Sequence, residues 1–192
     1  MLLHKLDSDW KMGDTIQIIF ETHSISEDNE RSIASGWNHS CLSERGKLLA
    51  RELGERRRED NIDAIFTSDL ERAVETARIA FENVSAPIFL DWRLRECNYG
   101  ALNGQPAKIV HGERRKYLDA PYPNGESWRQ AVARVCRFFG DIELLQRHAR
   151  ILIIGHVATR WACENFLTGV ALEELVSAEF VWREGWEYRM QR

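Results

Sequence analysis

Two short runs of β-branched and apolar residues, far apart in the 192-residue chain, each lead directly into a histidine. Residues 15–21 (TIQIIFE) are followed by Thr22-His23, and residues 150–155 (RILIIG) are followed by His156. Runs of this length and composition predict buried strands. Segments with helical spacing lie between them, and strands that alternate with helices predict an α/β sheet covered on both faces.

The rest of the chain supplies the elements that such a sheet needs. Ser43 is placed to cap one helix, and Ser68 or Asp69 to cap the next. Glu126 and Ser127 are expected to cap a long helix, and Gly169 to end the last one. We expect helices over about 43–58, 70–81, 106–118, 126–145 and 158–167, strands over 62–67 and 88–90, and a terminal strand or hairpin over 180–190.

The first 14 residues are polar and are expected to form a leader before a single domain over residues 15–192. The formal net charge is -4, and the acidic and basic residues are interspersed, so we expect no nucleic-acid or membrane partner. The apolar runs are too short to span a bilayer, and we expect a cytoplasmic protein. The four cysteines are scattered without metal-ligand spacing, so neither a metal nor a cofactor is expected.

The carboxyl ends of the strands are where a ligand is expected. In open α/β sheets, ligands bind beyond these ends. If the two histidine-terminated strands are parallel, His23 and His156 lie at the same edge of the sheet. The sequence therefore predicts a site there.

Motifs around these histidines resemble the histidine phosphatase superfamily, which includes cofactor-dependent phosphoglycerate mutase. The resemblance covers about residues 15–168, and its motifs occur in the family's order. It implies a three-layer α/β/α sandwich with a mostly parallel central sheet, like that of phosphoglycerate mutase. The matching positions are His23 with Asn29 and Gly36, the run Ser68-Asp69-Leu70-Glu71-Arg72-Ala73, the run Leu94-Arg95-Glu96 with Tyr99 and Gly100, the run Pro123-Asn124-Gly125-Glu126-Ser127, and Gly155-His156.

The resemblance also implies a role for each site residue. His23 would be the nucleophile that carries the phosphoryl group. His156 would donate hydrogen bonds to the transferring oxygens, and Arg72 would bind the phosphate with its planar guanidinium. Glu96 would protonate the leaving oxygen and later activate water, while Asn29 would add a side-chain donor.

The first motif departs from the family pattern, because Thr22 stands in place of its arginine and Ser24 in place of its glycine. Losing one charged donor removes about 1.5–3 kcal/mol of phosphate binding. Arg160, about one helical turn after His156, is expected to supply part of that charge, with Arg31 as a second candidate.

Three functions remain open from the sequence. The first is a phosphatase that hydrolyses a small phosphate monoester through phosphohistidine, and the second is a mutase of the phosphoglycerate mutase type. The third is a catalytically weak relative that binds a phosphorylated ligand. A homodimer is also possible.

Overall fold

The computed structural model describes residues 15–145 and 150–191, so the expected leader over residues 1–14 lies outside the described residues. A five-stranded sheet with the order β4-β3-β6-β1-β7 forms its centre, and β2 pairs with β5 in a small second sheet. The strands are β1 (Thr15–Thr22), β2 (Ile33–Ala34), β3 (Ala64–Thr67), β4 (Ile88–Leu90), β5 (Gln105–Pro106), β6 (Arg150–Gly155) and β7 (Trp186–Gln191).

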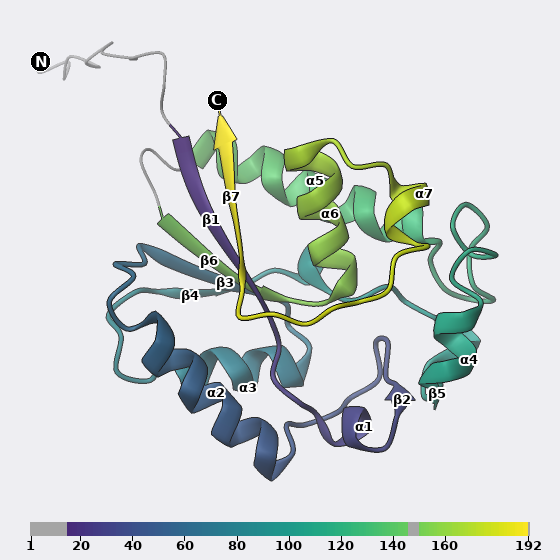
Figure 1. Ribbon diagram of the computed structural model, residues 1–192, viewed down its shortest axis with the longest axis horizontal. Coiled ribbons are helices and arrows are strands. Elements are labelled where there is room, and N and C mark those ends of the chain that lie inside the picture. Colours follow the sequence, from purple (N-terminus) through teal and green to yellow (C-terminus); the bar gives the residue numbers. More distant parts are fainter. Residues whose placement is uncertain (1–14, 146–149, 192) are drawn as a thin grey trace, which may run out of the picture.

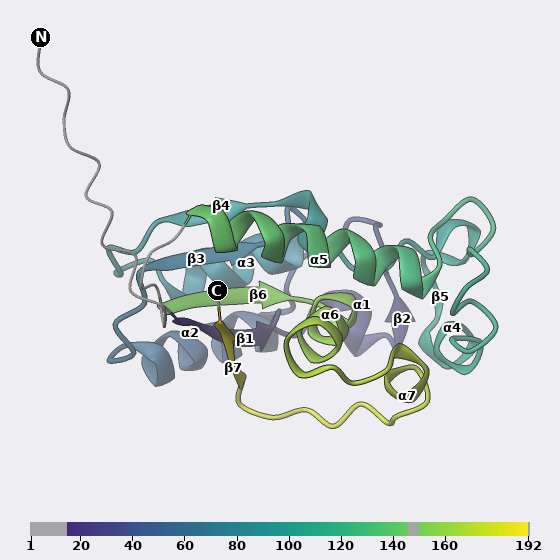
Figure 2. The ribbon, with the colours of Figure 1, turned by 90° about the horizontal axis from the view of Figure 1, so that it is seen from above.

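Helices lie on both faces of this sheet, so the fold is the three-layer sandwich that the sequence predicts. Figure 1 shows α2 and α3 on one side of the strands and α5 and α6 on the other, and Figure 2 shows the same layers from above. The helices are α1 (Glu27–Glu30), α2 (Glu44–Arg57), α3 (Glu71–Ala80), α4 (Ala107–Gly112), α5 (Trp128–Leu145), α6 (Val157–Thr168) and α7 (Leu172–Leu175), with short 3-10 turns η1 (Trp92–Leu94) and η2 (Gly100–Leu102).

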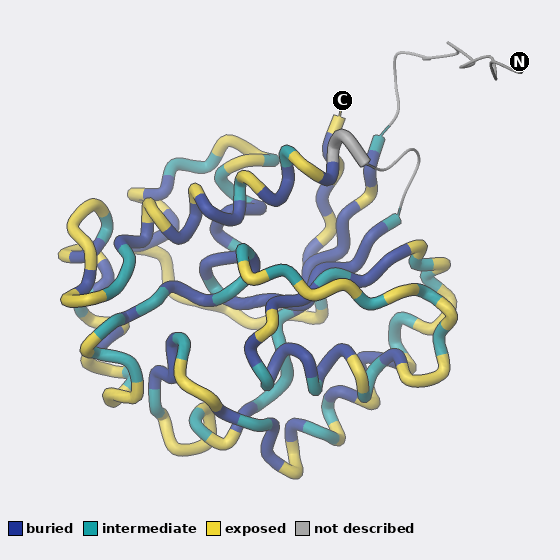
Figure 3. The backbone as a smooth tube through the Cα atoms, turned by 180° about the vertical axis from the view of Figure 1, so that it is seen from behind, coloured by how far each residue is buried: buried dark blue, intermediate teal, exposed yellow. Residues whose placement is uncertain are grey.

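The alternation of side chains along the two central strands produces two cores. In β1, Ile18 and Phe20 belong to the larger cluster, whereas Ile19 belongs to the smaller cluster on the other face. In β6, Ile153 and Ile154 divide in the same way. Both faces of each strand are therefore buried, which is why these segments read as continuous apolar runs. Figure 3 shows the buried central strands between helices whose outer sides are exposed.

The sheet is parallel except at one edge. Strand β1 pairs in parallel with β6 and antiparallel with β7. The expected terminal strand over residues 180–190 is shorter than predicted, because β7 begins only at Trp186. Gly185, with φ of 81°, turns the chain into the strand, and residues 179–185 cross the surface without regular structure.

Several helix ends agree with the sequence. Ser43 Oγ accepts a hydrogen bond from the Gly46 amide and caps α2, and Ser127 Oγ accepts one from the Gln130 amide at the start of α5. Gly169 ends α6 with a left-handed backbone. No helix among the described residues is long and apolar enough to cross a membrane.

Candidate active site

Strand pairing brings the two histidines together. The register of β1 and β6 places Thr22 opposite Gly155, so the next residues, His23 and His156, emerge at the same edge. The His23 amide also donates to the Gly155 carbonyl at 2.9 Å, and the ring centroids of the two histidines are 5.0 Å apart. The pairing predicted from the strand pattern is the pairing in the structure.

The hydrogen bonds of His23 fix its tautomer. Its Nδ1 lies 2.6 Å from the Ser24 carbonyl oxygen, which can only accept, so Nδ1 carries the proton. Nε2 then carries the lone pair, and this lone pair accepts a hydrogen bond from Arg72 Nε at 3.3 Å. Burial and the positive charge of Arg72 lower the pKa of His23 to about 3. The ring is therefore a neutral imidazole at physiological pH, which is the form that can attack phosphorus.

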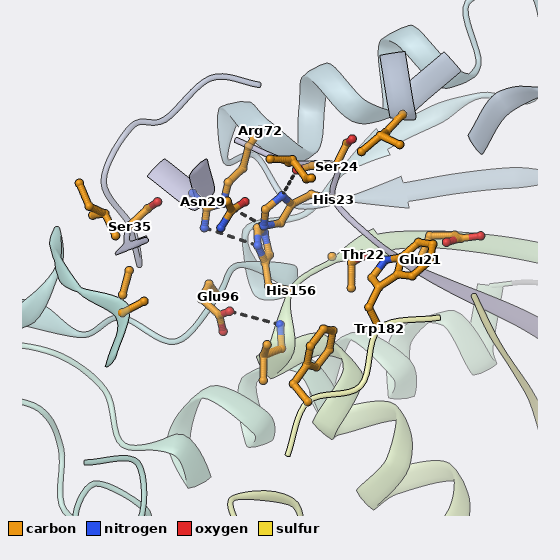
Figure 4. A pocket seen from close by; sticks show the side chains of 18 of the residues that line it. Glu21, Thr22, His23, Ser24, Asn29, Ser35, Arg72, Glu96, His156 and Trp182 are labelled. Atoms are coloured by element: carbon orange, nitrogen blue, oxygen red, sulfur yellow. Dashed lines mark hydrogen bonds between the residues drawn. The ribbon is translucent and has the colours of Figure 1, made fainter. Parts of the chain in front are cut away.

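Arg72 stands at the centre of the site, and α3 positions it just beyond the end of β3. Besides His23, its Nη2 donates to the Gly36 carbonyl at 2.9 Å and lies 3.5 Å from His156 Nδ1 (Figure 4). Its Nη1 is buried and has no hydrogen-bond partner among the residues that the structure describes. A buried guanidinium donor without a partner is costly, so this nitrogen marks where an anion would bind.

The carbonyl that Arg72 contacts depends on a glycine. Gly36 has φ of 55°, and a Cβ atom there would lie 1.8 Å from Asn103 Oδ1. Only glycine fits this close turn without strain. Gly36 therefore helps to hold the guanidinium in place.

His156 is buried, and it begins α6 as the N-cap residue. Burial, followed by the charge of Arg72, holds its pKa well below the ordinary value. Its Nε2 lies 2.7 Å from Ser68 Oγ. We expected Ser68 or Asp69 to cap α3, but Leu70 is the N-cap residue and has no side-chain cap. Ser68 instead contacts the second histidine, a role that the capping pattern concealed.

Glu96 reaches the site from the loop after η1. Its Oε1 accepts from the amides of Cys97 at 2.8 Å and Ala158 at 3.1 Å, and its Oε2 accepts from the Val157 amide at 3.2 Å. Three backbone amides thus fix this carboxyl group at the N-terminus of α6. Figure 4 shows it near His156.

A second arginine supports the loop that carries Glu96. Arg134 of α5 donates to the carbonyl of Glu96 at 3.2 Å and to the carbonyl of Arg93 at 2.6 Å. Both oxygens of Glu126 accept from Arg134 at 2.8 Å. We expected Glu126 to cap α5. This expectation was wrong, because the carboxylate of Glu126 binds the buried guanidinium of Arg134 instead.

Ser24 and Thr22, the positions expected to depart from the family motif, differ in their structural surroundings. Ser24 Oγ donates to the Gly46 carbonyl at 2.6 Å, so the added side chain is accommodated by hydrogen bonding. Thr22 lines the cavity with a short neutral side chain. Asn29 also lines it, and its Oδ1 accepts from the Ser26 amide at 3.0 Å, which leaves its Nδ2 group for a ligand.

The structure does not place Arg160 at the site. Its guanidinium lies 4.7 Å from the centre of the Trp186 ring and 3.9 Å from Glu164, and it does not line the cavity. Arg31 pairs with Glu27 on the surface at 2.6 Å and is also absent from the lining. The expectation that Arg160 or Arg31 replaces the charge of the arginine expected at position 22 was therefore wrong.

The site opens into a cavity of about 650 Å³. Such a volume suits a small organic ligand. Its lining includes His23, His156, Arg72 and Glu96. Within the described part of the chain, no group of three histidine, cysteine, aspartate or glutamate side chains is arranged to hold a metal ion.

Comparisons with known proteins agree with this geometry. The family model of the histidine phosphatase superfamily (branch 1) matches residues 18–180. A 2,3-bisphosphoglycerate-dependent phosphoglycerate mutase of Bartonella bacilliformis is 32% identical over 178 residues, which cover 84% of this chain and 86% of the mutase.

Solved structures give the same picture. Bacillus stearothermophilus YhfR superimposes with a TM-score of 0.78 at 25% identity, covering 88% of each chain. A mycobacterial glucosyl-3-phosphoglycerate phosphatase superimposes with a TM-score of 0.72 at 21% identity, covering 86% of this chain and 87% of that one. The second likeness concerns the fold alone.

Proposed function

The chain belongs to the histidine phosphatase superfamily (branch 1), and on that basis we propose that it hydrolyses a small phosphate monoester through a phosphohistidine at His23. The position of Arg72 is the observation that carries this proposal. One guanidinium contacts both histidines and keeps a buried donor unpaired within the described residues. A phosphoryl group bound there would lie beside the lone pair of His23 Nε2.

The first half of the reaction follows from these contacts. His23 Nε2 attacks phosphorus and forms an N–P bond, while the bond from phosphorus to the ester oxygen breaks. Arg72 and His156 stabilise the charge on the equatorial oxygens. Glu96, in its protonated form, gives its proton to the leaving oxygen, so the alcohol departs neutral.

The second half returns the enzyme to its starting state. Glu96, now ionised, takes a proton from water, and the water oxygen attacks phosphorus as the N–P bond breaks. Inorganic phosphate leaves, and His23 regains its free lone pair. Each step transfers one phosphoryl group and one proton, and neither step needs an oxidant or reductant.

The charge of the cavity favours hydrolysis over a mutase reaction. Among the described residues that line it, four are glutamates and three are arginines, and there is no lysine (Glu21, Glu52, Glu96, Glu184, Arg45, Arg56 and Arg72). The relatives named as mutases depend on 2,3-bisphosphoglycerate, which carries two phosphates and a carboxylate. A lining without excess positive charge is poorly suited to such a polyanion.

One assay distinguishes the functions. The protein is incubated with a panel of phosphate monoesters, and inorganic phosphate and positional isomers are followed together. Release of phosphate supports the proposal, whereas isomer formation from 3-phosphoglycerate, primed by 2,3-bisphosphoglycerate, supports a mutase. Saturable binding of esters without release of phosphate or formation of isomers would support the third function, a relative that only binds a phosphorylated ligand. Threonine in place of arginine at position 22 suggested that alternative.

A further inference from the structure

Aromatic and aliphatic side chains form one side of the cavity beyond the phosphate site. Leu49 and Leu53 come from α2, and Phe180 and Trp182 come from the surface segment 179–185. Figure 4 shows Trp182 on the side of His23 where Thr22 lies, away from Asn29 and Ser35. Trp182 is 57% exposed, although an aromatic residue of this kind gains a large apolar burial when it is covered.

The segment that carries these two rings is held by specific contacts. Arg57 Nη2 donates to the Glu184 carbonyl at 3.2 Å, and a Cβ atom at Gly185 would lie 2.0 Å from the same nitrogen. At the other end of the segment, the Arg160 guanidinium lies 5.5 Å from the centre of the Phe180 ring. The Phe180 ring and the backbone at Glu184, on either side of Trp182, are therefore held at the cavity before a ligand arrives, which reduces the entropy lost on binding.

The charges around this side of the cavity largely cancel. Glu21 is buried, and its Oε1 accepts hydrogen bonds from Arg56 at 3.2 Å and Arg57 at 2.8 Å. Arg45 and Glu52, from the same helix as Leu49, contribute one charge of each sign to the lining. The non-phosphate part of a ligand would meet apolar rings and no surplus of either charge, so an uncharged group fits best.

We propose that Phe180 and Trp182 form a binding subsite for the alcohol part of the substrate, and that this part is an uncharged aromatic group stacked on Trp182. The inference rests on the proposed phosphatase function and specifies its substrate class. Thr22 contributes by leaving space between the phosphate site and the rings that a longer side chain would occupy. An offset-stacked ring pair adds binding beyond that of apolar area alone.

A matched pair of substrates tests the subsite. Benzyl phosphate and cyclohexylmethyl phosphate are similar in size and both release a primary alcohol, but only the first contains an aromatic ring. We expect the parent enzyme to prefer benzyl phosphate in kcat/KM, mainly through KM. Trp182→Leu retains apolar bulk and should lower this preference by about fivefold, whereas Trp182→Phe should retain most of it.

The control is Trp92→Leu, because Trp92 is also an exposed tryptophan, at 51%, but does not line the cavity. Binding of benzylphosphonate and cyclohexylmethylphosphonate, which cannot be hydrolysed in the same way, separates the subsite from the chemistry. Preferential binding of the aromatic phosphonate without any ester hydrolysis would overturn the proposed function and still support the subsite. Equal affinities, or equal effects of the Trp92 and Trp182 substitutions, would overturn the subsite.

Discussion

Ser68 Oγ lies 2.7 Å from His156 Nε2, and both residues are buried. Since Arg72 Nη2 can only donate, the 3.5 Å contact makes His156 Nδ1 an acceptor and directs the Nε2 proton to Ser68. To donate to a phosphoryl oxygen, Nδ1 must instead carry a proton. The hydroxyl of Ser68 allows this change, because it can also donate to Nε2.

Ser68→Ala is therefore expected to lower kcat by about tenfold through loss of this hydrogen bond. Ser68→Thr keeps the hydroxyl and should recover most of the rate. The pH–rate profile of the two variants is the deciding measurement, because a merely structural loss would leave its shape unchanged.

His23→Ala should abolish turnover while the protein remains folded, because it removes the ring nitrogen that lies beside Arg72 Nε and would attack phosphorus. Rapid quenching of the parent enzyme during turnover should trap an acid-labile, base-stable phosphoenzyme. The same experiment on the variant should trap none. Activity of the variant within tenfold of the parent would exclude the phosphohistidine mechanism.

Glu96→Gln is expected to slow hydrolysis of esters with alcohol leaving groups by about 10²–10⁴, because proton transfer to the leaving oxygen is lost. Aryl esters with strongly acidic leaving groups need less protonation and should be slowed much less in the phosphorylation step. Pre-steady-state bursts with both substrate types measure that step. An equal loss for both types would assign Glu96 to positioning only.

Thr22→Arg tests the departure from the family motif directly. The residue lines the cavity one position before His23, so an added guanidinium could donate to the phosphate. We expect inorganic phosphate to inhibit the variant at concentrations about tenfold lower than the parent. Thr22→Met is the control for side-chain length, and a similar gain in both variants would exclude a charge effect.

Stability should fall in acid because His23 is buried as a neutral ring. Its pKa is about 3 in the folded protein against 6.5 ordinarily, so between these values the unfolded chain binds a proton that the folded chain does not. The free energy of unfolding is then expected to fall as pH decreases from 6.5 toward 3, by up to about 1.4 kcal/mol per pH unit.

Urea denaturation between pH 7.5 and pH 4 measures this dependence. His23→Gln should flatten it, whereas His39→Gln, at an exposed position, should leave it unchanged. His156, whose pKa is also lowered by burial, should contribute part of the remaining slope. Identical slopes in the parent and in His23→Gln would contradict the assignment.

The histidine pair could be predicted from the sequence because strand composition, strand order and the chemistry of strand ends all indicate the same edge. Arg160 could not be placed, because helical spacing gives its height along α6 but not the neighbour that its side chain meets. That neighbour is Trp186, on a strand that begins only after the turn at Gly185. The alternating residues before the turn suggested a longer strand than the one that forms.

Ser68 shows a different limit of prediction from sequence. A serine just before a helix is ordinarily interpreted as a cap, and only the packing of β3 against β6 reveals its contact with His156. Asp69 was the other expected cap, and its carboxylate pairs with Arg95 instead. Local patterns predicted that these residues cap the helix, but they could not identify the distant partners that the two side chains contact instead.

Strand β1 lies between β6 and β7 in the sheet. In the sequence, more than half of the described residues separate β1 from either of these neighbours. During synthesis on the ribosome, the first apolar strand is therefore made long before either neighbour exists. Long-range pairings of this kind form slowly, and an unpaired apolar strand favours aggregation. Recovery of catalysis after dilution from denaturant would therefore follow the last stage of folding, when the two distant parts of the chain meet.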